Sequence, residues 1–238
     1  MLVLDTATPA VTAAVVRVGV TTVELVSVQV AADTSTGRRH GELLAPAVAA
    51  VLAAAGLAAA DLAAVVAGTG PGPFTGLRVG LVTAAAFADA LSIPAYGVCS
   101  LDGIGGAAPA VQAGGRVLGR AGAPGRVLVA TEARRREVYW AAYADGVRFA
   151  GPAVERPAEL AEQLPALGVV AACGAGARQY ADVLGLPVTG PDWPDPVALA
   201  AAAADRVRAG APADPLTPLY LRHPDAVEPG RPKAVTPA

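Results

Sequence analysis

Gly68-Thr69-Gly70-Pro71-Gly72-Pro73-Phe74-Thr75-Gly76-Leu77-Arg78-Val79-Gly80 is the most informative stretch of the sequence. A short, valine-rich apolar run at 62–67 precedes it, and a longer apolar run without proline at 77–91 follows it. This order is typical of a strand, a glycine loop and a helix. The prolines and glycines cannot continue the strand, and we expect the Thr75 hydroxyl to accept from the free amides that open the helix. Such a helix start suits an anion or the carboxylate of a partner.

Two familiar nucleotide-binding loops do not fit this stretch. A Walker loop ends in lysine followed by serine or threonine, whereas Gly76 is followed by Leu77 and Arg78. The dinucleotide fingerprint needs Gly-x-Gly-x-x-Gly, and the spacing from Gly72 to Gly76 misses it by one residue. Glycines alone would also fit a tight turn from strand to helix that binds no ligand.

The full string is more specific, because it resembles the Gly-Pro-Gly-Ser-Phe-Thr-Gly-Leu-Arg-Ile-Gly signature of the TsaB (YeaZ) family. Members of this family are bacterial proteins that support formation of threonylcarbamoyladenosine on tRNA. Pro73 departs from the family serine and Val79 from its isoleucine. The signature positions that we assign to the family motif are Gly70, Pro71, Gly72, Phe74, Thr75, Gly76 and Arg78.

Three further segments resemble the family. Residues 39–46 are similar to its Arg-x-His-Ser-x-x-Leu-Leu-Pro stretch, although a local capping role for His40 is the simpler interpretation. Residues 132–139 resemble its Asp-Ala-Arg-x-x-Glu-Val-Tyr, with Glu132 in place of aspartate, and residues 218–222 resemble its Pro-x-Tyr-Leu-Arg. The resemblance therefore covers nearly the whole chain.

The composition describes a folded protein that lacks the charge for holding RNA. Hydrophobic residues make up 54% of the 238 residues, charged residues 16%, and the formal net charge is −2. The one basic cluster is 134–136, so we expect the chain to act on tRNA only through partner proteins. Lys233 is the only lysine, which excludes Schiff-base and phosphate-loop chemistry. Two cysteines, no signal peptide and no apolar run near the ~18 residues of a membrane helix predict a cytoplasmic protein.

The order of elements predicts an α/β protein made of two similar halves. We expect strands at 1–5, 11–18 and 22–30, a helix at 42–55 that Gly56 ends and that begins near Gly41 or Leu43 because of Pro46, a strand at 63–68, a helix at 77–91 and a strand at 94–98. Beyond these, we expect a helix at 101–112, a loop at 114–125, strands at 127–131, 137–143, 147–150 and 169–172, and helices at 157–164, 178–184 and 196–209.

The βββαβα order thus occurs twice, as in the actin, hexokinase and Hsp70-like (ASKHA, ribonuclease H-like) fold, and the TsaB family is similar to that fold. We place the first half at 1–102, with the partner-binding helices, and the second half at 103–222, with helix 196–209 able to pack back on the first. We expect a flexible tail at 223–238.

The resemblance implies no catalytic residue and no metal site. In that superfamily a carboxylate of the first hairpin helps to hold a metal-bound phosphate; Asp5 occupies this place, but a simple Asx turn explains it better. The catalytic paralogue TsaD carries His-x-x-x-His past the fifth strand, where Ser100 and Ile104 stand here. Neither Cys99 nor Ser100 has a histidine placed to activate it. We expect no cofactor in the chain alone, with ATP or ADP possible at the interface of a complex.

The two helices of the first half predict a partner interface. Both are apolar nearly all round, whereas packing on a sheet needs a single apolar stripe, although a general excess of alanine would give the same pattern. The resemblance also implies pairing through these helices, with TsaD or between copies. The interface residues that we predict are Leu43, Leu44, Ala47, Val48, Val51, Thr75, Leu77, Arg78 and Leu81.

The resulting hypothesis is a non-catalytic scaffold of the tRNA threonylcarbamoyladenosine transferase complex, without activity alone. Its expected partners are a TsaD-type catalytic subunit, a TsaE-type ATPase and, when alone, a second copy. The alternative is a nucleotide-binding, actin-like ATPase or kinase that uses Asp5 and the glycine loops at 174–176 and 103–106.

Overall fold

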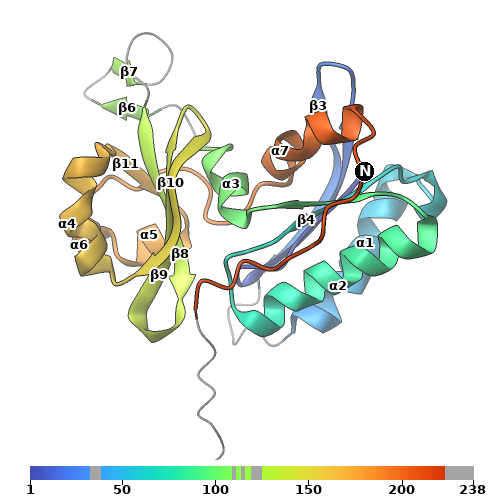
Figure 1. Cartoon of the computed structure of the whole chain (residues 1–238), viewed down its shortest axis with the longest axis horizontal. Helices are drawn as coiled ribbons and strands as arrows, with labels where there is room; N and C mark the ends of the chain where they lie inside the picture. The colour runs from blue at the N-terminus through green and yellow to red at the C-terminus, as the bar shows by residue number, and fades with distance from the viewer. Residues whose placement is uncertain (33–38, 109–110, 114–115, 119–124, 223–238) are drawn as a thin grey trace, which may run out of the picture.

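The chain forms two mixed sheets with helices on both sides of each (Figure 1). The computed structural model describes residues 1–32, 39–108, 111–113, 116–118 and 125–222. The predicted loop at 33–38 and the tail at 223–238 lie outside the described residues.

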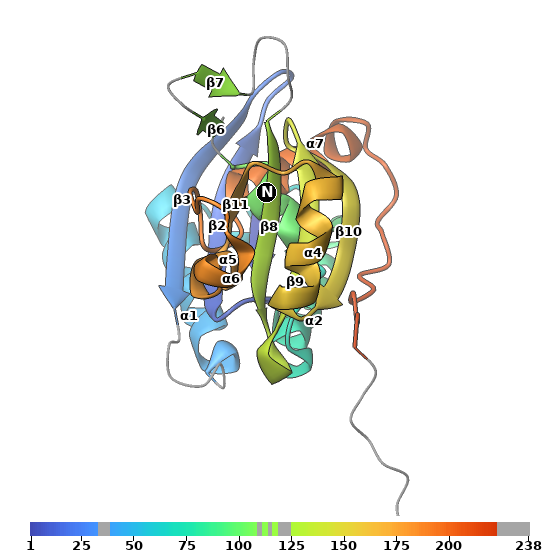
Figure 2. The ribbon, with the colours of Figure 1, turned by 90° about the vertical axis from the view of Figure 1, so that its left-hand side faces the viewer.

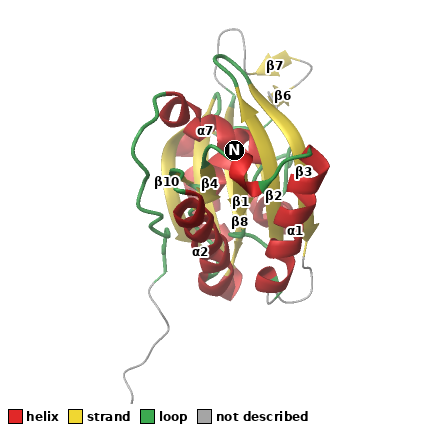
Figure 3. Ribbon diagram, turned by 90° about the vertical axis from the view of Figure 1, so that its right-hand side faces the viewer, coloured by secondary structure: helices red, strands yellow, loops and turns green. Residues whose placement is uncertain are grey.

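The first sheet has the order β3-β2-β1-β4-β5 within the described part of the chain. Its strands are β1 (Leu2–Asp5), β2 (Ala10–Val18), β3 (Val23–Ala32), β4 (Val65–Gly68) and β5 (Ala95–Val98), and β1 pairs antiparallel with β2 and parallel with β4. Helices α1 (His40–Ala55) and α2 (Phe74–Leu91) lie side by side on one face (Figure 3). Helix α7 (Pro196–Arg208) packs through Leu199, Ala200 and Ala203 on the other face.

The second sheet has the order β10-β9-β8-β11. Its strands are β8 (Arg126–Ala133), β9 (Glu137–Ala144), β10 (Val147–Glu155) and β11 (Ala171–Cys173). Helices α4 (Pro157–Leu167), α5 (Ala175–Gln179) and α6 (Ala181–Leu184) cover its outer face (Figure 2). Helix α3 (Ser100–Gly105) packs on its inner face through Leu101 and Ile104. The chain therefore buries a core on each face of both sheets.

Most predicted elements are present. Helix α1 begins at His40, one residue before the expected start near Gly41, with Pro46 inside the helix. Three predictions of detail are wrong. Helix α2 begins at Phe74 with Pro73 as N-cap, so Thr75 lies in its first turn and caps nothing. The single helix expected at 178–184 is split into α5 and α6 around Tyr180.

The helix expected at 101–112 ends at Gly105. The chain beyond it forms a small pair of strands, β6 (Val111–Ala113) and β7 (Arg116–Leu118), in the region expected to be helix and loop. Gly105 lies so close to the ring of Tyr143 that a Cβ atom would sit 2.5 Å from it. Gly105 therefore allows α3 to pack closely on β9, and α3 ends at this residue. Short one-turn helices η1 (Ala59–Asp61) and η2 (Arg134–Arg136) complete the described elements.

Helix α2 bears on the expectation that no segment could cross a membrane. Among the described residues it is the single helix long and apolar enough, by length and composition, to do so. Leu77, Leu81 and Ala84 are nevertheless buried against the sheet, and a core helix passes the same test of length and composition.

Candidate partner interface and the polar cluster beneath it

The glycine loop between β4 and α2 is packed against the protein itself. A Cβ atom on Gly72 would lie 2.2 Å from the carbonyl oxygen of Ala7. The amide of Gly70 donates to the Ser100 hydroxyl at 3.1 Å, and the amide of Ser100 donates to the Gly70 carbonyl at 2.7 Å. The loop is therefore a turn that needs glycine for close approach, and these amides already have partners.

Thr6, in the turn after β1, fixes the position of α2. Its hydroxyl donates to the carbonyl of Gly76 at 2.8 Å and accepts from the amide of Gly80 at 2.9 Å. These two groups would otherwise pair directly within the helix, because they are four residues apart. A Cβ atom on Gly80 would come 2.5 Å from the Thr6 hydroxyl oxygen. The second part of the signature, from Gly76 to Gly80, thus holds α2 against β1.

Asp5 is a buried structural carboxylate. Its Oδ2 accepts from the Ser100 hydroxyl at 2.5 Å, and its Oδ1 accepts from the Ala7 amide at 3.0 Å. Burial raises the pKa of Asp5 to about 6, against the lowering effect of these hydrogen bonds and of His40. A Cβ atom on Gly68 would lie 1.7 Å from Oδ2, so the carboxylate fills its space. Both oxygens of the Asp5 carboxylate are therefore engaged within the chain, and the Asx turn favoured by the sequence is present. That Asp5 binds a cofactor stays a prediction.

His40 joins the same buried polar cluster, which we define as Asp5, Thr6, Thr8, His40 and Ser100. The Nε2 atom of His40 lies 2.9 Å from the carbonyl oxygen of Thr8 and donates to it. The ring also packs beside Gly76 at the start of α2. The cluster ties the starts of α1, α2 and α3 to the turn after β1.

The places considered for catalysis offer no open donor set. Ser100 and Ile104 are fully buried, the first on Asp5 and the second in the core. In the part of the chain that the structure describes, no three His, Cys, Asp or Glu side chains come together in a way that could hold a metal ion. In the glycine loops of the alternative hypothesis, a Cβ atom would lie 2.2 Å from Ala130 at Gly174 and 2.8 Å from Leu199 at Gly103. These glycines serve packing.

The predicted interface residues divide between core and surface. Most of them face the sheet and are buried, so the prediction is wrong for Leu44, Ala47, Val48, Val51, Leu77 and Leu81. Leu43 is half-buried, and Thr75 and Arg78 are exposed. A helix that is apolar on both sides gives no polar stripe from which to orient it, so sequence alone chose the wrong side.

The surface that α1 and α2 present to solvent is nevertheless apolar. On α2, Val82 is 66% exposed and Phe74 is 50% exposed. The other exposed residues of the two helices are small or polar: Gly41, Glu42, Ala45, Pro46, Ala49, Ala50, Ala53 and Ala54 on α1, and Thr75, Arg78, Ala85, Ala86, Asp89 and Ala90 on α2. We call this set, with Phe74 and Val82, the helix face. An apolar surface of this kind is typical of an interaction site.

An aromatic group stands at one end of the helix face. The rings of Phe74 and Tyr220 are stacked with centroids 5.0 Å apart, and the guanidinium carbon of Arg78 lies 3.7 Å from the Phe74 centroid. Arg78 Nε donates to the Tyr220 hydroxyl at 2.9 Å. The segment after α7 is thereby fixed on the N-terminal end of α2.

Three signature segments meet beside this group, which the sequence did not reveal. They line a cavity of about 730 Å³ with Gly72, Pro73, Phe74, Arg134, Arg135, Glu137, Tyr139, Val154, Tyr220, Leu221 and Arg222. Arg222 Nε donates to Glu137 at 3.0 Å, which joins the last segment to β9. Arg135 and Arg136 have φ of 65° and 61°, a left-handed conformation that residues other than glycine seldom adopt.

Comparisons with known proteins point in one direction. The family model "TsaD: tRNA N6-adenosine threonylcarbamoyltransferase" matches residues 25–189. An uncharacterised protein of Mycobacterium tuberculosis is 49% identical over 228 residues, which cover 95% of this chain and 93% of that protein. The tRNA threonylcarbamoyladenosine biosynthesis protein TsaB of Escherichia coli is 36% identical over 106 residues, 44% of this chain and 42% of its own.

A solved structure extends the likeness over the whole fold. YeaZ from Pseudomonas aeruginosa superposes with a TM-score of 0.68 and 25% identity, and the match covers 92% of this chain and 98% of that chain. With the mixed sheets described above, this likeness confirms the predicted α/β, actin-like fold class.

Proposed function

The chain belongs to the TsaB (YeaZ) family, within the group built on the TsaD-type domain, and from this membership we propose that it acts in tRNA threonylcarbamoyladenosine formation as a scaffold. Its role is to support a TsaD-type catalytic subunit, and bond-making belongs to that subunit. The actin-like ATPase is not favoured, because Asp5 and the glycines it would use are engaged in packing.

The helix face is the observation that carries this proposal. Val82 and Phe74 expose large apolar side chains among alanines that let another helix approach closely. Burying such a surface is favourable by about 25 cal/mol per Å² of apolar area. The residues that we propose to contact a partner are therefore exposed ones such as Val82. Thr75 and Arg78, which the sequence analysis also assigned to the interface, remain among them.

The remaining partners follow from the same proposal. A TsaE-type ATPase joins the complex, a second copy covers the helix face when the chain is alone, and tRNA is met through the partners. The net charge of −2 supports the last point. Two buried, unpaired cysteines support a cytoplasmic setting.

ATP or ADP bound at the interface of the complex is also part of the proposal. The cavity beside Phe74 adjoins the helix face and has Arg134 and Arg222 in its wall, which suits phosphate groups. Calorimetry with ATP and magnesium tests this point: the proposal expects binding by the complex and none by the isolated chain. Turnover by the isolated chain would favour the ATPase alternative instead.

Reconstitution of tRNA modification tests the scaffold role. We expect formation of threonylcarbamoyladenosine by a TsaD-type subunit and its ATPase partner to require this chain. The variant Val82→Glu should lose this support, whereas Val183→Glu should keep it, because Val183 is a comparably exposed valine on α6 in the second half, at 48%. Full modification without the chain, or with Val82→Glu, would contradict the proposal.

A further inference from the structure

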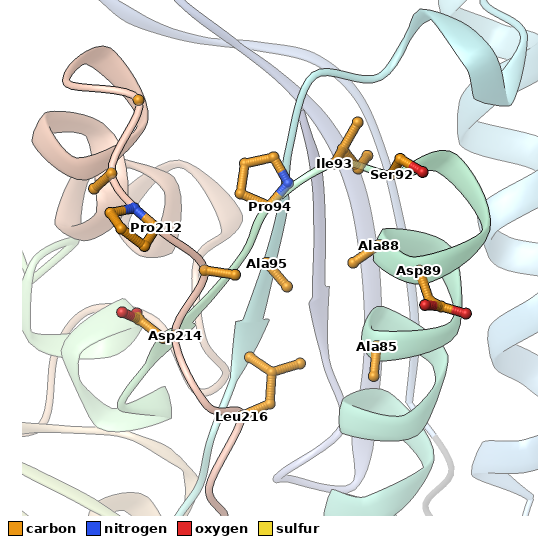
Figure 4. A pocket seen from close by; sticks show the side chains of 13 residues that line it. Ala85, Ala88, Asp89, Ser92, Ile93, Pro94, Ala95, Pro212, Asp214 and Leu216 are labelled. Carbon is orange, nitrogen blue, oxygen red and sulfur yellow. The ribbon is translucent and has the colours of Figure 1, made fainter.

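The two edges of the first sheet differ in how they are covered. At the β5 edge, the segment that follows α7 lies beside the strand: the Asp214 amide donates to the Ala95 carbonyl at 2.9 Å, and the Gly97 amide donates to the Asp214 carboxylate at 3.3 Å. Figure 4 shows Asp214 and Leu216 on this segment, next to Ala95. At the opposite edge, no described strand pairs with the outer side of β3 (Figure 2). Such an edge presents a row of unpaired backbone groups.

The hydrogen bonds of β2 show which residues of β3 turn their backbone groups outward. The N-terminal ammonium of Met1 donates to the Val16 carbonyl at 2.8 Å, and the Val16 amide donates to the Met1 carbonyl at 3.0 Å. Val16 therefore bonds on the β1 side, and because the bonding side alternates along a strand, Val15 bonds to β3. Val15 pairs with Ser27, so the backbone groups of Ser27 are used within the sheet. Those of the next residue, Val28, point outward.

The open edge is also apolar. Leu25, Val26, Val28 and Val30 are each 38–47% exposed. Val28 pairs with Ala14, which lies in the core beneath α7, so Val28 stands on the α7 face of the sheet. Val26 and Val30 are two residues away on either side and share that face. The exposed valines therefore form a strip along the open edge.

Edge strands usually carry features that prevent pairing with another chain, and β10 of the second sheet has them. Its pairing with β9 is interrupted by two register shifts, and Pro152 lies within the strand. Strand β3 contains no proline, lysine or arginine. Its one register shift lies near Leu25 and leaves the pairing with β2 regular from Ser27 onward. A long, regular, apolar edge of this kind is a predicted site of association.

The sequence of this edge is complementary to itself. Val26-Ser27-Val28-Gln29-Val30 alternates valine with polar residues and is centred on Val28. If a second copy runs antiparallel about a twofold axis at Val28, each Val28 lies opposite its counterpart and Val26 lies opposite Val30. Ser27 then lies opposite Gln29. The valines of both copies form one apolar strip, and the polar side chains meet on the other face of the sheet.

We propose that β3 is an interface between two copies of this chain, whose β3 strands pair antiparallel about a twofold axis at Val28 and join the two first sheets into one. Each copy supplies the same residues, and the outward backbone groups of one strand bond to those of the other. The two Glu24 carboxylates stand at opposite ends of the contact, so like charges do not meet. Because the contact lies at the edge of the sheet, it leaves Phe74 and Val82 of the helix face free.

Oxidative cross-linking of the full chain tests the register. Residues directly opposite each other have Cα atoms about 4.5–5.5 Å apart, within reach of a disulfide, whereas a displacement by four residues separates them by about 13 Å. Val28→Cys should therefore give a disulfide-linked dimer, and Val26→Cys alone should not. A mixture of Val26→Cys and Val30→Cys chains should link. Cys99 and Cys173 are buried and should take no part.

Sedimentation velocity measures how much β3 contributes to association. The Val82→Glu variant, in which contacts through the helix face are blocked, should still form dimers. Adding Val28→Lys places two cations at the twofold axis and should raise the dissociation constant at least tenfold. Adding Val147→Lys, at an exposed valine of β10, is the matched control and should leave it unchanged. Both valines are exposed, so neither substitution should shift the melting temperature much.

The outcomes separate the β3 contact from the scaffold role. Dimers that tolerate Val28→Lys would overturn the contact and leave the scaffold role standing. Disulfide formation by Val26→Cys alone would overturn the axis at Val28. A Val82→Glu chain that stays monomeric at every concentration would overturn pairing with a second copy. If Val28→Lys then weakened binding of a TsaD-type subunit, the edge would belong to that subunit instead.

Discussion

Replacing Gly80 by alanine should have opposite effects on stability depending on Thr6. In the natural chain the new Cβ atom would lie 2.5 Å from the Thr6 hydroxyl oxygen, which is held between two backbone groups of α2. Such overpacking costs about 1–3 kcal/mol, and alanine recovers about 0.5–1 kcal/mol of helix propensity. We therefore expect Gly80→Ala to lower the free energy of unfolding by about 1–2 kcal/mol.

The Thr6→Ala variant lacks the hydroxyl oxygen with which the new Cβ atom would clash. The nearest remaining Thr6 atom, Cβ, stands 3.5 Å from the added carbon, which is ordinary contact. Gly80→Ala should then raise the free energy of unfolding by about 0.5–1 kcal/mol, which gives a coupling of about 2–3 kcal/mol between the two positions. Urea unfolding of the four variants, followed by circular dichroism, measures this cycle. Equal destabilisation by Gly80→Ala in both backgrounds would refute the inference that the Thr6 hydroxyl occupies the space left at Gly76 and Gly80.

Two further predictions concern the buried polar cluster and the orientation of α1. Burial raises the pKa of Asp5 to about 6 in the folded chain, from an ordinary 3.8, so the folded state holds this proton more tightly. The stability of the natural chain relative to Asp5→Asn should therefore fall by roughly 2–3 kcal/mol as the pH rises from about 4 to about 6, and a flat difference in urea midpoints would contradict it. Val48→Glu buries a charge at a position 3% exposed and should unfold the chain, whereas Ala49→Glu on the exposed side should shift the melting temperature little.

The helices and strands could be predicted from the sequence where the composition changes sharply along the chain. The valine-rich run before Gly68 and the apolar run after Leu77 both form the expected elements, and Gly56 ends α1 in the left-handed conformation. The helix expected from Leu101 failed, because Gly105 is required against the ring of Tyr143, a contact between residues far apart in sequence.

The site was harder to predict, for a physical reason. Helices α1 and α2 have apolar residues on every side, so the pattern of the sequence could not say which side faces the sheet. Val48 and Leu77 were thereby assigned to the exposed side, whereas both are buried and Val82 is exposed. The meeting of the segments around Phe74, Arg134 and Tyr220 depends on tertiary structure, although all three belong to signature segments.

The most direct test of the helix face is the affinity between this chain and a TsaD-type subunit, measured by titration calorimetry with Val82→Glu and Val183→Glu. Burying a carboxylate among apolar side chains should weaken binding by at least about a hundredfold for Val82→Glu, and Val183→Glu should bind as the natural chain does. Equal, undiminished affinity for both variants, with melting temperatures unchanged, would contradict the account.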